Sequence, residues 1–155
     1  MGAQPKVKAF LLCDQVIIGN DGKHSVIGVF QRIHAGQFPV FHPRFGIYIR
    51  LGEMRGAYDL TIRFYDPGEQ RTLAEAQLKG IKHERPLDDF ESGVNLPGIE
   101  LPHEGVFEVQ LLANGQLINV DTLRAIKVDM PPGSPGGPPR VQGGPSGGVS
   151  PDPFA

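Results

Sequence analysis

The chain has 155 residues, with 15 basic and 17 acidic side chains, a formal net charge of −2 and a pI near 6.2. This length suggests one domain, and the near-neutral charge excludes the basic footprint of a protein that binds nucleic acid or an anionic membrane. The single cysteine, Cys13, allows neither an internal disulfide nor a cysteine-based zinc cluster. The apolar run at 9–13 is too short for a signal peptide or a membrane helix, so we expect a cytoplasmic protein.

The first predicted strands form a hairpin. Residues 7–13 are apolar at both alternating positions, as in a central strand that is covered on both faces. A break at Asp14 separates this run from a continuation over 15–18. The cluster Asn20-Asp21-Gly22 then predicts a turn, and residues 25–33 predict the return strand.

The next segment carries two prolines and predicts a crossover between two sheets. Pro39 and Pro43 cannot donate to a strand ladder, so residues 38–43 are expected to be extended and loop-like. Alternation resumes over 45–51, which predicts another strand. Three aromatic side chains are expected to plug one end of the core here: Phe38, Phe41 and Phe45.

The middle of the chain predicts an antiparallel pair joined by a tight turn. Residues 58–65 alternate between apolar and polar side chains, as in a half-buried strand. In the turn 66–69, Pro67 presets φ at the second position and Gly68 accepts the strained third position. Residues 71–79 alternate again. Their composition also suits a helix, but the preceding turn and the short length favour a strand.

Residues 81–101 are the least regular part of the chain before the tail, because two prolines and two glycines divide them and Pro102 follows directly. They predict a packed long loop or a short edge strand, and 87–90 could form a single helical turn. The apolar side chains expected to anchor this segment are Leu87, Phe90, Val94, Leu96 and Ile99.

The strongest local signal is a hairpin over 105–128. The pair Asn114-Gly115 tolerates positive φ at both central turn positions, which matches the twist of paired strands. Ile118 should point inward on the return strand. Strict alternation from there would bury Arg124, so we expect a bulge or bend near 121–123.

These features predict an all-β, two-sheet antiparallel sandwich of immunoglobulin-like type, with about seven to nine short strands over residues 7–129. A small closed barrel is the alternative. Residues 1–6 are expected to be a flexible N-terminus. Residues 131–155 contain eight prolines and seven glycines, and such a segment buries too little apolar surface to offset its ordering entropy. We therefore expect a disordered Pro/Gly-rich tail over 130–155.

Two stretches resemble a family of small bacterial all-β proteins of unknown function. The first is an apolar strand ending in Cys13-Asp14, followed by an Asp21-Gly22 turn and by residues 25–30, which match the pattern S-x-I-G-V-F. The second is the closing hairpin, 104–128. The resemblance covers about residues 7–128 and implies the immunoglobulin-like sandwich without implying any activity.

No motif for catalysis or for a cofactor is present in the sequence, so we predict no catalytic, cofactor-binding or metal-binding residues. The acidic cluster of Asp88, Asp89 and Glu91 matches no calcium loop, and the sequence leaves open whether it binds a cation. The histidines lie too far apart for a zincin or zinc-finger spacing and are expected to be surface loop residues. They are His24, His34, His42, His83 and His103.

Two further sets of residues could be given a functional interpretation. The segment 150–155 carries Phe154 after a flexible spacer, and the sequence does not decide whether this aromatic docks in a partner. Four other side chains would share one outward face if their strands pair, although ordinary cross-strand packing is the simpler explanation. They are Tyr48, Arg50, Arg63 and Tyr65.

We therefore expect a non-catalytic β-sandwich that binds another protein or self-associates, with an edge strand as acceptor and the tail as tether. The alternative is a small-ligand-binding protein or an enzyme. Its site would lie in residues 38–45 and 81–103, because function concentrates in long irregular segments.

Overall fold

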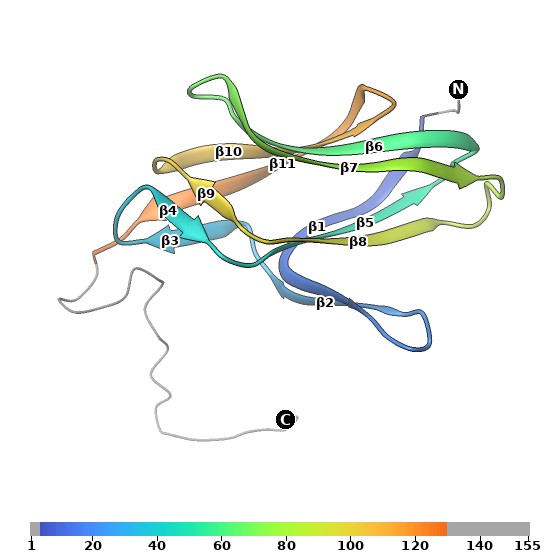
Figure 1. Ribbon diagram of the computed structural model, residues 1–155, viewed down its shortest axis with the longest axis horizontal. Coiled ribbons are helices and arrows are strands. Elements are labelled where there is room, and N and C mark those ends of the chain that lie inside the picture. Colours follow the sequence, from blue (N-terminus) through green and yellow to red (C-terminus); the bar gives the residue numbers. More distant parts are fainter. Residues whose placement is uncertain (1–3, 130–155) are drawn as a thin grey trace.

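The computed structural model describes residues 4–129, and this part of the chain folds into eleven β-strands (Figure 1). A four-stranded sheet, in the order β2-β1-β5-β8, contains β1 (Lys6–Ile18), β2 (His24–Val29), β5 (Phe45–Gly52) and β8 (Phe90–Leu96). A five-stranded sheet, in the order β3-β11-β10-β6-β7, contains β3 (Arg32–Ala35), β6 (Gly56–Asp66), β7 (Arg71–His83), β10 (Gly105–Ala113) and β11 (Gln116–Lys127). The short strands β4 (Val40–His42) and β9 (Ile99–Leu101) pair with each other.

The two larger sheets pack face to face around one apolar core, which confirms the predicted all-β, immunoglobulin-like sandwich. Phe45 from one sheet meets Phe64 from the other edge to face, with ring centroids 4.8 Å apart. The described strands outnumber the seven to nine expected, because the chain forms additional short strands where it passes between the sheets. The expected tail over 130–155, with Phe154, lies outside the described residues.

The predicted return strand 25–33 is divided between the two large sheets. β2 ends at Val29, the chain crosses at Phe30, and β3 then joins the opposite sheet beside β11. Apolar residues recur through both β2 and β3, so the sequence pattern did not indicate that the strand is interrupted between them. β3 runs parallel to β11, whereas every other pairing among the described strands is antiparallel.

β1 is continuous through Asp14, where we expected a break. Its first half pairs with β5, and its second half pairs with β2 beyond Cys13. The β1–β2 hairpin folds over the outer face of the four-stranded sheet (Figure 1). There the backbone N–H of Val16 donates to the Asn95 side chain and its carbonyl accepts from the same amide, both at 2.9 Å.

The proline-containing crossover includes the short strand β4 instead of being loop throughout. Phe45 is 1% exposed and Phe38 packs against the core, as expected. The prediction for Phe41 was wrong, because its side chain is 59% exposed.

The β10–β11 hairpin forms as predicted, with φ of 50° and 80° at the turn pair Asn114-Gly115. The bulge lies at Ile118, where the register shifts, and not at 121–123. It reverses the alternation, so Leu123 is buried and Arg124 points outward.

β7 confirms the preference for a strand over a helix after the Asp-Pro-Gly turn. In that turn the positive φ falls on Gln70, at 53°, and not on Gly68. The irregular region 81–101 supplies the edge strand β8, one of the two alternatives expected. Leu87 is 98% exposed, so it does not anchor this region.

Candidate functional site: the groove between strands β3 and β4

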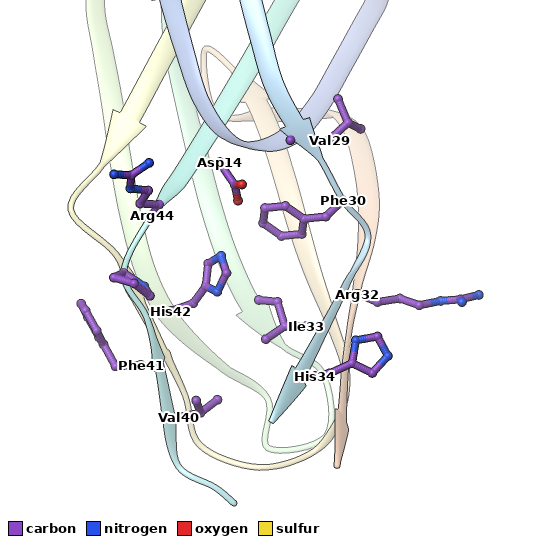
Figure 2. Close-up of a pocket in the computed structure, with 12 residues that line it drawn as sticks. Asp14, Val29, Phe30, Arg32, Ile33, His34, Val40, Phe41, His42 and Arg44 are labelled. Carbon is purple, nitrogen blue, oxygen red and sulfur yellow. The ribbon is translucent and has the colours of Figure 1, made fainter. Parts of the chain in front are cut away.

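A pocket of about 770 Å³ lies between β3 and β4, where the chain passes between the two large sheets (Figure 2). One wall comes from residues 28–34 and the other from residues 40–44. Asp14, from the middle of β1, completes the lining. We refer to this pocket as the β3–β4 groove.

The two walls of the groove are strand edges that do not pair across it. Within residues 4–129, β3 pairs only with β11 and β4 only with β9. The carbonyls of Gln31 and Ala35 accept hydrogen bonds from the backbone of the β11 segment, at 2.9 Å each. Because successive residues of a strand direct their backbone groups to opposite sides, the N–H and C=O groups of Arg32 and His34 face the open edge.

The inner end of the groove is aromatic. The rings of Phe30, His42 and Phe45 meet edge to face, with centroids 5.2 to 6.2 Å apart. Ile33 points into the groove from the β3 side (Figure 2). This lining is typical of an apolar binding site with few polar groups.

The carboxylate of Asp14 lies against the backbone of Gly28. A Cβ at Gly28 would be 2.4 Å from Oδ2 of Asp14, and Gly28 has a φ of 70°. Both the conformation and the space therefore require glycine at this position. Figure 2 shows the carboxylate directed into the groove beside Phe30. Among the described residues, no cation lies within ion-pairing distance of it.

His42 brings the second polar group into the groove. Its Nε2 atom is buried without a hydrogen-bond partner among the described residues. Burial lowers the pKa of His42, and the negative charge of Asp14 only partly opposes this shift. The imidazole is therefore neutral at neutral pH, so it cannot act as a counter-ion for Asp14.

Basic side chains lie around the rim of the groove. Arg32 and His34 point away from its centre, and Arg44 lies at the opposite rim (Figure 2). The exposed Phe41 ring points away from the groove on the outer side of β4 and lies over Gly98 (Figure 2). The groove thus has a negative, largely apolar interior beneath a more basic rim.

The prediction of surface loop positions was wrong for His24 as well as His42. The His24 side chain is 10% exposed beneath the β1–β2 hairpin, and its ring centroid is 5.8 Å from that of Tyr48. Its Nδ1 lies 3.3 Å from Oε1 of Glu91 without hydrogen-bond geometry, while the Tyr48 hydroxyl donates to Glu91. This cluster packs the hairpin onto the sheet.

The acidic residues of the 88–91 segment do not converge on a common point. Asp88 pairs with Arg85 at 2.9 Å. Asp89 bridges Lys8 and Arg50, also at 2.9 Å each, and these contacts lower the pKa of Asp89. The third carboxylate of the segment, Glu91, accepts the hydrogen bond from the Tyr48 hydroxyl. These ion pairs account for the cluster structurally.

One group of side chains has the spacing of a metal site, namely Asp66, Glu69 and His103. Nε2 of His103 lies 2.7 Å from Oδ2 of Asp66, and Nδ1 lies 2.7 Å from the carbonyl of Glu104. Both partners are acceptors, so both ring nitrogens donate and the imidazole is cationic. These hydrogen bonds raise the pKa of His103. An imidazolium cannot ligate a metal, so we interpret the group as an ion pair.

The structure separates the four residues considered as one outward face, since two lie on β5 and two on β6, in different sheets. They are Tyr48 and Arg50 on β5, and Arg63 and Tyr65 on β6.

The sequence did not reveal the groove, because its polar residues are far apart in the chain. Asp14 and Gly28 both lie in the first of the two stretches that carry the family resemblance, in Cys13-Asp14 and in residues 25–30. The Asp14 carboxylate occupies the space left by the missing side chain of Gly28, which explains why the stretch carries both residues. A glycine in mid-strand, as at Gly28, indicates that a neighbouring side chain approaches closely, and the structure shows that this neighbour is Asp14.

The described residues form an all-β sandwich of immunoglobulin-like type, with the β3–β4 groove between two unpaired strand edges. The chain belongs to a family described as "Family of unknown function (DUF6941)", whose model matches residues 8–126. No curated protein matches the sequence. Among solved structures, an immunoglobulin-like protein from Pseudomonas aeruginosa is similar, with a TM-score of 0.40 and 11% identity over 79% of this chain and 97% of the other. In the described residues no helix is long and apolar enough to cross a membrane.

Proposed function

We propose that this protein is a non-catalytic binding module that takes an extended segment of a partner protein into the β3–β4 groove. One observation carries the proposal: two strand edges line an apolar groove without pairing across it. An extended segment that enters such a groove gains main-chain hydrogen bonds from the edges and burial for its side chains. A cytoplasmic location is part of the proposal, and fractionation of cells that express the full chain tests it.

The groove favours a peptide over a compact small ligand. Backbone groups of Arg32 and His34 along one wall suit the regular spacing of a strand better than a single polar head group. Segment 40–44 lines the groove, as the small-ligand alternative requires, but no residue of 81–103 does. The small-ligand alternative would instead use a smaller pocket of about 230 Å³, where residues 43–45 meet Asn95 and Leu96.

Selection of displayed random heptapeptides on the full chain tests the proposal, followed by NMR titration of the best peptide. We expect the amide signals of Arg32 and His34 to shift. Val40→Ala should weaken binding at least about fivefold, because it removes an apolar side chain that points into the groove. Leu87→Ala truncates an apolar side chain that is exposed outside the groove and serves as the control. If no peptide is enriched, or if the shifts fall elsewhere, the proposal is wrong.

Self-association through β2 is a second candidate. β2 is an edge strand, and the β1–β2 hairpin exposes Ile17, Ile27 and Val29 by 42%, 45% and 56%. An exposed apolar edge is prone to pair with another chain. Sedimentation velocity of the full chain over a concentration series tests this candidate. A dimer that Ile27→Lys dissociates would support it, and a monomer at all concentrations would refute it.

A further inference from the structure

The Asp14 carboxylate differs from the other carboxylates of low exposure in the described structure. Asp66 is fully buried and pairs with His103, and Asp89, with a side chain 16% exposed, bridges two cations. Asp14 is half-buried in the groove, yet none of the ion pairs or hydrogen bonds found within residues 4–129 involves its carboxylate. An unpaired carboxylate in an apolar setting loses hydration without gaining a partner.

The position of this carboxylate is fixed by its surroundings. Gly28 leaves space that the carboxyl group occupies, and the Phe30 ring lies beside it in the groove (Figure 2). A polar group held on a packed support is pre-organised to meet a ligand, because little rotamer freedom remains to be lost.

No cation within residues 4–129 pairs with Asp14. His42 is neutral, as argued above, and Arg32 points away from the groove (Figure 2). Arg44 lines the opposite rim and forms no ion pair with Asp14 in the described structure. A positive charge that pairs with Asp14 would therefore come from outside the described residues.

We propose that the extended segment recognised by the β3–β4 groove carries a lysine or arginine whose charged end pairs with Asp14, flanked by apolar residues that pack on Ile33 and Val40. This inference rests on the proposed function and specifies its partner. A charge-assisted hydrogen bond to a carboxylate is strengthened where water is partly excluded. Phe30 beside the carboxylate adds an aromatic ring, which also attracts a cation.

An acidic segment fits the groove less well despite the basic rim. It would bring a like charge toward Asp14 in a poorly hydrated space. The rim arginines are exposed, so their attraction for an anion is largely screened by solvent.

The heptapeptide selection on the full chain tests this inference when its products are compared in composition. We expect lysine or arginine to be enriched at one fixed position. Replacing that residue with norleucine in the best peptide should weaken its affinity at least about tenfold, which corresponds to about 1.4 kcal/mol. This comparison uses the unaltered protein, so it does not depend on the folding of any variant.

Asp14→Asn should remove most of the difference between the basic and norleucine peptides. Asp88→Asn makes the same charge change at an exposed position outside the groove and should preserve the difference. Enriched peptides that are neutral or acidic at every position would overturn the inference while leaving peptide binding intact. If no peptide is enriched at all, the proposed function fails as well.

Discussion

Val16 lies directly against Gly93 on the outer face of the four-stranded sheet. A Cβ at Gly93 would be 2.3 Å from Cγ1 of Val16, closer than any two such atoms can pack. Together with the hydrogen bonds between Val16 and Asn95, this contact seats the β1–β2 hairpin on β8.

We expect Gly93→Ala to lower the free energy of unfolding by about 2 kcal/mol, because the added methyl group overpacks the contact. Chemical denaturation measures the change. In a Val16→Gly background the same substitution should cost less than about 1 kcal/mol, since both Cγ1 and Cβ of Val16, which a Cβ at Gly93 would overlap, are then absent. Gly68→Ala is the matched control, because a Cβ there would meet only Oδ1 of Asp66, at an ordinary 3.4 Å. An equal loss in both backgrounds would contradict the contact.

Gly28→Ala should destabilise the protein for two separable reasons. The φ of 70° strains any residue with a Cβ by about 1–2 kcal/mol, and the overlap with Asp14 adds to this cost. We expect a total loss of about 3 kcal/mol in the wild-type background. With Asp14→Ala, only the strain of about 1–2 kcal/mol should remain. If the cost does not fall in the double variant, Asp14 does not occupy the space above Gly28.

The ion pair of His103 and Asp66 should make stability depend on pH. Hydrogen bonds to Glu104 and Asp66 raise the pKa of His103, so its contribution is complete below its ordinary pKa of about 6.5 and is lost as pH rises through the raised value. Burial opposes ionisation of Asp66, but hydrogen bonds from His103 and the Glu69 amide outweigh it and lower the pKa of Asp66. Its contribution is complete above about pH 3.9 and is lost as pH falls through the lowered value.

We therefore expect His103→Gln to cost about 2 kcal/mol near pH 5.5, because it removes a charged partner from the buried Asp66 carboxylate. The difference from wild type should shrink near pH 9. Urea unfolding of both proteins across this pH range provides the measurement. His83, which contacts backbone carbonyls, gives the control variant His83→Gln. A cost that is independent of pH would show that the charge of His103 is unimportant.

Asn114→Ala should destabilise the β10–β11 hairpin by about 2 kcal/mol, because it combines backbone strain with two lost hydrogen bonds. Asn114 adopts a φ of 50°, and its side chain accepts from the Asp59 amide at 2.9 Å and donates to the Ala57 carbonyl at 3.3 Å. Asn114→Gly should relieve the backbone strain of the alanine variant, because glycine adopts this φ readily, but it should not restore the two hydrogen bonds. Thermal unfolding distinguishes the two variants, and equal melting temperatures would contradict this division.

Features set by neighbouring residues could be predicted from the sequence. The Asn114-Gly115 turn and the alternation in β6 depend on local conformation, and both form as expected. The bulge was placed too late because its position depends on the register with β10. At Ile118 the shift is invisible in the return strand alone.

Features set by distant contacts could not be read in this way. Alternation does not record which sheet a strand joins, so the change of sheet at Phe30 was missed. The groove residues Asp14 and His42 line one pocket because β1 pairs with β5, which begins three residues after His42. Similarly, the residues near His103 in the sequence do not indicate that its partner is Asp66, which is 37 positions away.

The parallel pairing of β3 with β11 has a consequence for the order of events during synthesis. β3 is made early, but among the described strands its sole neighbour is the last to be translated. While β11 has not yet emerged from the ribosome, β3 lacks the strand that it pairs with, so the β3 wall of the groove is not held in place. Partner capture should accordingly be confined to finished molecules, and incomplete translation products should be unable to compete for the same peptide.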